Sequence, residues 1–172
     1  RYSVETQDVA SSSTSVVPVL ARPSLTNSAK FKRFTPRVSV RYELAPRTNV
    51  YASYSQGFRS GAFNLSLPIC TQTNPACWQP AKQETIEAFE VGFKTARGPV
   101  RLELAGFYYN YKNLQVSTTR TIGGFPVVDI TNAPKAKIYG AEGSFDVELA
   151  ENFNVRGSAT WLHARYGDNF IF

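Results

Sequence analysis

The chain has 172 residues, a hydrophobic content of 42% and a net charge of +6, from 19 Lys and Arg against 13 Asp and Glu. Its mean hydropathy is −0.26. No apolar run approaches the roughly 20 residues that a spanning helix needs, which excludes a helical membrane protein. A membrane β-barrel is not excluded, because its alternating strands average to near-neutral hydropathy. The cationic residues are scattered through the strand candidates, which argues against a nucleic-acid partner.

Alternation of apolar and polar residues predicts about seven strands. They lie at 1–9, 31–44, 49–58, 84–95, 100–116, 135–149 and 153–165. The clearest is 135–149, where Phe145, Val147 and Leu149 share one face while Asp146 and Glu148 share the other. The aromatic run at 107–111 breaks strict alternation, which predicts a bulge or an interfacial belt there.

The connections alternate between short and long. Tight turns are predicted at 45–48, 96–99 and 150–152, and long loops at 10–29, 60–81 and 117–134, with Gly123-Gly124 turning a small hairpin within the last. Strands near or above the 9–11 residues that cross a bilayer, joined in this way, are typical of an outer-membrane barrel. A soluble β-sandwich would have shorter strands and a turn every 8–12 residues. The sequence therefore predicts an all-β, antiparallel up-and-down transmembrane β-barrel.

Seven strands predict only an incomplete segment of such a barrel. Two strand edges would stay unpaired, and in hydrocarbon each unsatisfied backbone group costs several kcal/mol. The chain also starts in the middle of a pattern at Arg1-Tyr2-Ser3-Val4, so we expect that its natural start is missing.

Two cysteines, Cys70 and Cys77, lie close together in the loop predicted at 60–81. A metal site would need more thiol or imidazole ligands, and the only histidine is the distant His163, so no metal site is predicted. A local disulfide in an exported loop is favoured. His163 follows Trp161 near a strand end, which favours an interfacial histidine over a member of a catalytic triad. We therefore predict no enzyme site.

Charged residues form two further candidate sites. One is a basic cluster of Lys30, Lys32, Arg33 and Arg37, interpreted first as a solvated rim and second as a contact for lipopolysaccharide phosphates. The other is the carboxylate pair Asp146 and Glu148. Arg156 and Lys137 offer it partners on the same face of neighbouring strands, so ordinary salt bridges are favoured over an ion or plug contact.

Four blocks of the sequence resemble the barrel of TonB-dependent outer-membrane receptors. They read TPRVSVRYELAPRTNVYASYSQGFRSGAFN, EAFEVGFKT, LELAGFYYNYKNLQV and NAPKAKIYGAEGSFDVEL, in that order, within residues 31–166. At Gln83-Glu84 the sequence departs from the family, in which a Pro-Glu pair is more usual. The resemblance implies a multi-pass barrel of about 22 strands with a plugged lumen, of which residues 1–172 would be a part without plug or TonB box.

The resemblance also implies a function. It indicates active import of a ferric siderophore or a similar metal chelate across the bacterial outer membrane, energised by TonB and the inner-membrane complex through the plug. The protein would hold no cofactor of its own, because iron would arrive within the ligand. The expected partners are TonB, the chelate, outer-membrane lipid and lipopolysaccharide. Two alternatives stay open: a passive porin or structural barrel, and a soluble β-rich binding domain.

Candidate ligand-binding residues are Phe58, Arg59 and Phe63, at the predicted junction of strand and long loop. Arg59 would attract an anionic chelate and the two rings would stack on it; alternatively, the three residues fix the loop. Membrane-interface residues are predicted at Tyr108, Tyr109, Tyr111 and Trp161, because amphipathic rings suit the headgroup zone.

Overall fold

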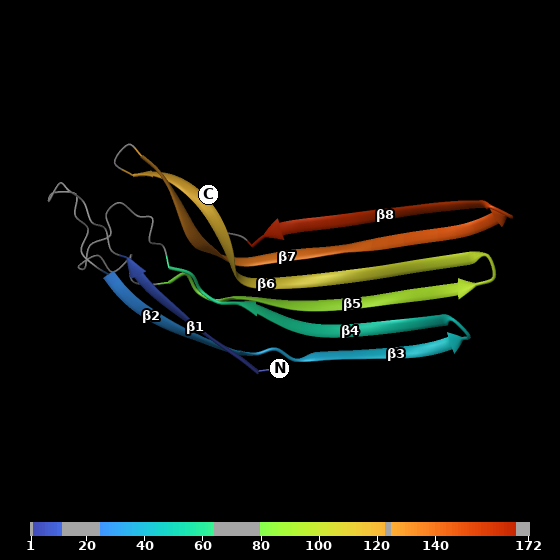
Figure 1. Cartoon of the computed structure of the whole chain (residues 1–172), viewed down its shortest axis with the longest axis horizontal. Helices are drawn as coiled ribbons and strands as arrows, with labels where there is room; N and C mark the ends of the chain where they lie inside the picture. The colour runs from blue at the N-terminus through green and yellow to red at the C-terminus, as the bar shows by residue number, and fades with distance from the viewer. Residues whose placement is uncertain (1, 12–24, 64–79, 123–124, 168–172) are drawn as a thin grey trace.

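The computed structural model describes residues 2–11, 25–63, 80–122 and 125–167, which form eight antiparallel strands (Figure 1). The strands are β1 (Tyr2–Ser11), β2 (Leu25–Phe34), β3 (Arg37–Ala45), β4 (Thr48–Arg59), β5 (Glu84–Arg97), β6 (Val100–Ile122), β7 (Phe125–Ala150) and β8 (Phe153–Tyr166). β3 to β8 form one sheet in chain order, and β1 pairs with β2 in a separate hairpin. The predicted all-β antiparallel meander is confirmed. Within the described residues the sheet does not close, since β3 pairs only with β4 and β8 only with β7.

No helix in the described part of the chain is long and apolar enough to cross a membrane.

Three two-residue turns join the strands at one end of the sheet. Pro46-Arg47, Gly98-Pro99 and Glu151-Asn152 connect the pairs, as the sequence predicts. Each contains one residue in the left-handed region, with φ of 59° at Arg47, 55° at Gly98 and 64° at Asn152. A register shift precedes the first and third turns, which adds local twist to strands that must reverse within two residues.

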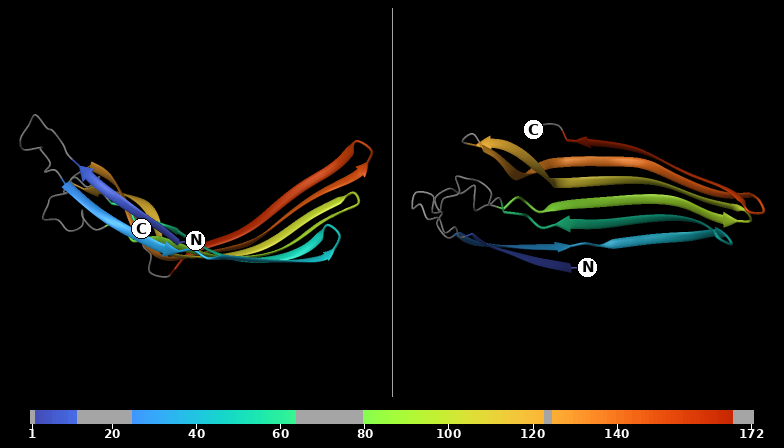
Figure 2. Two further views of the ribbon diagram at one scale, coloured as in Figure 1. Left: turned by 60° about the horizontal axis from the view of Figure 1, so that its bottom comes forward. Right: turned by 45° about the horizontal axis from the view of Figure 1, so that its top comes forward.

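The opposite end differs from the sequence prediction. The loop expected at 117–134 is largely strand: β6 and β7 pair from Val100 with Val147 to Ile122 with Phe125. This confirms a hairpin around 123–124, although those two residues lie outside the described part. The outer half of this hairpin extends beyond β5 and β8 and bends away from the sheet (Figures 1 and 2). The bend coincides with Asn113, whose φ of 54° interrupts the ladder opposite Pro134.

The strand predicted at 31–44 is two strands. β2 begins earlier, at Leu25, and the ladder breaks at Thr35-Pro36 before β3. Proline has no amide hydrogen to donate, so it interrupts a ladder. The carbonyl of Pro36 still accepts a hydrogen bond from the Gln56 amide at 2.9 Å, which holds the break against β4.

The sheet has an apolar face whose large side chains are exposed. Val40, Tyr42 and Trp161 are 64%, 66% and 61% exposed, whereas the buried apolar residues of the described part are Ala133 and Ala136. A soluble domain of this composition would bury such side chains. The described residues therefore lack the interior of a compact sandwich, and the apolar side chains form one contiguous surface.

We expect the left-handed conformation at Asn152 to limit what this turn tolerates. Asn152→Val should destabilise the full gene product by about 1–2 kcal/mol, because a β-branched side chain clashes with the backbone at positive φ. Asn152→Gly should be neutral or stabilising. Denaturant unfolding of the two variants measures the difference. Glu151→Val, at the neighbouring turn position, is the matched control, and an equal loss in the control would contradict the conformational cause.

Candidate ligand-facing surface and outward face

Side chains of the six-stranded sheet align in rows across the strands, because the register is unbroken from the tight turns to the opposite end of the sheet. The end away from the tight turns is called the upper end below. Five rows make up the apolar face. They are Val38-Tyr54-Phe89-Tyr108-Tyr139-His163, Val40-Ala52-Val91-Gly106-Ala141-Trp161, Tyr42-Val50-Phe93-Leu104-Gly143-Ala159, Thr48-Thr95-Leu102-Phe145-Gly157 and Arg97-Val100-Val147-Val155. At about 3.3 Å per residue, Val100 to Tyr108 spans about 26 Å along β6. A tilt of about 40° reduces this height to roughly 20 Å, close to the apolar band of a membrane barrel.

The first of these rows, hereafter the aromatic row, forms the upper border of the apolar face. Tyr54 packs on Phe89 with ring centroids 4.8 Å apart, and Tyr139 packs on His163 at 5.1 Å. Directly above it the same face becomes polar, with Glu87 accepting hydrogen bonds from Asn110 at 3.0 Å and Lys112 at 3.4 Å. The apolar face is therefore bounded by rings and then by charge.

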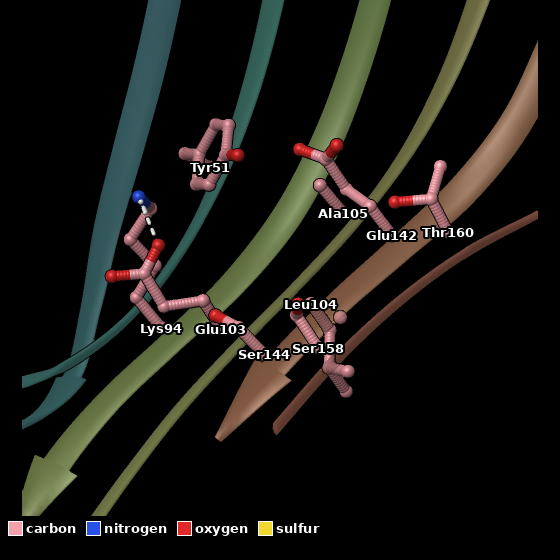
Figure 3. A pocket seen from close by; sticks show the side chains of 10 residues that line it. Tyr51, Lys94, Glu103, Leu104, Ala105, Glu142, Ser144, Ser158 and Thr160 are labelled. Atoms are coloured by element: carbon pink, nitrogen blue, oxygen red, sulfur yellow. Dashed lines mark hydrogen bonds and ion pairs between the residues drawn. The ribbon is translucent and has the colours of Figure 1, made fainter. Parts of the chain in front are cut away.

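The opposite face is polar and hollowed (Figure 3). A depression of about 230 Å³ extends from Tyr51 on β4 to Thr160 on β8, so the sheet curves toward this face. Within it Lys94 forms an ion pair with Glu103 at 2.8 Å, and its ammonium lies 5.8 Å from the Tyr51 ring centroid. Both charged side chains are about half exposed, so the pair stabilises the fold by less than about 1 kcal/mol. The wall is wetted and lightly charged, and in the described residues no acidic, histidine or cysteine cluster could hold a metal ion.

Near the turns, the same polar face carries Asp146 and Glu148, the two carboxylates for which salt bridges are predicted. Asp146 lies between Arg101 and Arg156 in the ladder and accepts a hydrogen bond from Asn154 at 3.4 Å. The proposed partnership with Lys137 is incorrect. Lys137 shares its face with Tyr139, since both positions are odd-numbered on an unbroken strand, and therefore lies on the outward side.

A polar network fastens the upper ends of β4 and β5 to β6 and β7. The Asn132 side-chain oxygen accepts a hydrogen bond from the Lys82 amide at 2.7 Å. Its side-chain nitrogen donates hydrogen bonds to the carbonyls of Lys82 and Asn113 at 3.0 and 2.8 Å. Gln115 donates its side-chain amide to the Ser60 carbonyl at 2.7 Å, while its backbone amide donates to Glu84 at 2.8 Å. These contacts fix both ends of the segment 60–83 to the projecting hairpin.

The β1–β2 hairpin joins the same network. The Ser60 hydroxyl donates to Glu5 and accepts from Gln7, both at 2.9 Å. Gly61 is buried beside them, and a Cβ atom there would clash with the Ala81 carbonyl oxygen and lie 2.7 Å from the Phe31 ring. Only glycine allows this approach. No local sequence pattern marks this network, because its partners are 19 to 55 residues apart.

The three predicted ligand-binding residues lie at this junction but do not form one cluster. Phe58 and Arg59 are neighbours in an unbroken ladder, paired with Thr85 and Glu84, so their side chains leave opposite faces. Arg59 is exposed and lies on the face of Tyr51, while Phe58 and Phe63 are half-buried. Cys70 and Cys77 lie outside the described residues, so their disulfide stays a prediction.

The predicted interface residues divide between the two faces. Tyr108 lies in the aromatic row and Trp161 in the apolar row below it. Tyr109 and Tyr111 lie on the polar face, where Tyr109 stacks on Phe107 with centroids 5.0 Å apart. No register shift occurs along 107–111. The run therefore supplies rings to both faces, and of the four predicted residues Tyr108 and Trp161 lie on the apolar face.

The basic cluster predicted at 30–37 is also dispersed. Lys30 and Lys32 are exposed on one face of β2, and Arg33 points to the other. Arg37, on β3, pairs with Ser55 on the polar face of the sheet. These four charged residues are close in the sequence, but the fold separates their side chains.

Comparison with known proteins gives the family. Residues 1–171 match the sequence profile described as TonB dependent receptor-like, beta-barrel. The chain belongs to this family. Its members are outer-membrane receptors and transporters, not enzymes. In the family barrel the apolar face corresponds to the wall that contacts lipid, and the polar face to the lumen.

A named relative and two solved structures agree with this membership. The chain is 26% identical over 132 residues to a rhizobactin receptor from Rhizobium meliloti (strain 1021), covering 70% of this chain and 17% of that protein. The copper transporter OprC has a TM-score of 0.70 at 16% identity, over 85% of this chain and 23% of OprC. The siderophore receptor PirA from Pseudomonas aeruginosa has a TM-score of 0.64 at 20% identity, over 83% and 31%. The chain thus spans about a sixth of the relative's length, and the two structures support the fold.

Asn132 is the residue of the network whose loss should loosen the junction most. Asn132→Ala removes the acceptor of the Lys82 amide and the donor to the Asn113 carbonyl, while the Lys82 carbonyl keeps its contact with Gln115; the loss should cost about 1–3 kcal/mol. Hydrogen exchange at Lys82 should accelerate by roughly tenfold or more. Asn154→Ala, which removes one 3.4 Å contact at the turn end, is the control. Unchanged exchange at Lys82 would contradict the anchoring role.

The two faces should respond differently to charge. Leu104, in the middle row of the apolar face, is 48% exposed, and its neighbour Ala105 lies on the polar face near Glu103 and Glu142. Leu104→Lys should cost about 2–4 kcal/mol in a bilayer, whereas Ala105→Lys should cost little. The measurement is the amount of folded receptor in the outer membrane. Equal amounts of the two variants would contradict the face assignment.

Proposed function

We propose that the protein is an outer-membrane active transporter for a ferric siderophore or a similar metal chelate, energised through TonB. The observation that supports this proposal most is the family profile over residues 1–171, together with the likeness to a receptor named for rhizobactin. The same membership and the apolar face, whose height suits a bilayer, support a multi-pass outer-membrane location.

The metal would be cargo rather than a resident cofactor. The likeness to a receptor named for rhizobactin supports a chelated ion as the cargo. A lumenal face of hydroxyls, amides and a few solvent-exposed charged side chains suits a polar solute that must enter and leave without tight binding. TonB and its inner-membrane complex would act through a plug domain of the whole receptor.

A gene deletion tests the cargo. A strain lacking the full gene should lose growth on one ferric siderophore under iron limitation, and a plasmid copy should restore it. Undiminished uptake of every iron chelate offered would reject the siderophore assignment while leaving the barrel fold in place. Normal uptake after removal of TonB would instead favour a passive porin.

Arg59 is the candidate contact for an anionic chelate, because it is exposed at the upper end of β4 on the lumenal face. Arg59→Gln should weaken binding of the transported chelate by about 3- to 30-fold, since a charge-assisted hydrogen bond would be lost. Arg101→Gln, on the same lumenal face near the tight turns, removes an equal charge and is the matched control. Titration of the purified receptor measures both. Equal affinities would assign Arg59 to anchoring the loop.

A further inference from the structure

The outward face carries a cationic cluster just beyond the aromatic row, at the end away from the tight turns. Lys112 lies opposite Lys135 on neighbouring strands, and Lys137 lies opposite Arg165. Like charges directly opposite each other destabilise a sheet. Two such pairs side by side therefore favour a bound anion that compensates their repulsion.

The described residues supply little compensation themselves. Lys112 contacts Glu87 at 3.4 Å, but within the described part of the chain Lys135, Lys137 and Arg165 have no ion pair. These three line a hollow of about 370 Å³ together with Pro134, Tyr166 and Gly167, and no acidic side chain is among the lining. Asp168, the next acid in the sequence, lies outside the described residues. The hollow is thus a concave cationic site.

The height of the cluster indicates which anion it meets. At about 3.3 Å per residue, Lys137 lies roughly 7 Å along β7 from Tyr139, and Lys135 lies roughly 13 Å from it. Aromatic rings mark the headgroup level, and long cationic side chains reach that level from the strand. Because the cluster faces outward, a solute in the lumen cannot reach it.

We infer that Lys135, Lys137 and Arg165 bind the phosphate groups of a phosphorylated glycolipid in the external leaflet. Arg165 offers a planar pair of donors to one phosphate, and the two lysines add point charges around it. The end of a barrel with the longer connections is external, which places the cluster in that leaflet. The inference rests on the proposed membrane location and not on the cargo.

Lipid titration tests the inference on the unmodified protein. The full gene product, purified in detergent and freed of lipid, is titrated with bis-phosphorylated lipid A and with its dephosphorylated form. We expect at least tenfold tighter binding of the phosphorylated lipid and no competition from millimolar inorganic phosphate. Equal binding of the two lipids would overturn the inference. Full competition by inorganic phosphate would also overturn it, in favour of a free-anion site.

Matched variants locate the site. The triple variant Lys135→Gln, Lys137→Gln, Arg165→Gln should lose affinity for lipid A on the order of a hundredfold, at about tenfold or less per charge. The control Arg41→Gln, Arg101→Gln, Arg156→Gln removes the same charge from the lumenal face and should stay within about threefold. Equal affinities of the two triple variants would refute the assignment.

A second measurement separates this inference from the proposed function. Absence of the wild-type protein from the outer membrane would overturn the membrane location and the lipid site together. Loss of chelate uptake in the lumenal variant, with lipid A binding intact, would concern transport alone. A Lys135→Arg, Lys137→Arg variant keeps the charge and should retain lipid A binding, and its failure to do so would contradict an electrostatic site.

Discussion

The constraint on which this structure depends is the pairing of backbone groups across an unbroken register. Each strand of the sheet satisfies its backbone hydrogen bonds only through its neighbours, and in lipid no water replaces a missing partner. The ladder therefore fixes the register, and the register fixes which side chains share a face. A single slip would exchange the two faces of a strand. The five apolar rows exist because every junction between β4 and β8 keeps the same parity until the turns.

The same parity explains what could be predicted from sequence. Alternation at 135–149 gave the correct faces for Phe145, Val147 and Asp146, because a strand face is a local property. The tight turns were also predictable, since Pro46, Gly98 and Asn152 suit the reversals in which they lie. A single belt that contains both Tyr108 and Tyr109 is wrong, because adjacent residues of an unbroken strand cannot share a face.

Other features depend on contacts that one stretch of sequence does not contain. The extension of β6 and β7 beyond 116 and before 135 is stabilised by their pairing with each other, and the prolines and glycines of that stretch suggested a loop. The network of Ser60, Gln115 and Asn132 joins segments that lie far apart in the chain. The end of the sheet away from the tight turns is thus the least predictable part, because its geometry results from long-range polar pairing rather than from periodicity.

The distribution of charge shows the same contrast. Clustering in sequence suggested a basic site at 30–37, but alternation and the break at Pro36 send those side chains in different directions. Arg165 lies far from Lys135 and Lys137 in the sequence, yet the register places the three around one hollow. In a sheet, two charged side chains are close enough to interact when they occupy neighbouring positions in the same row or in adjacent rows of one face. Charge spacing along the chain is informative about a barrel surface only after the register is known.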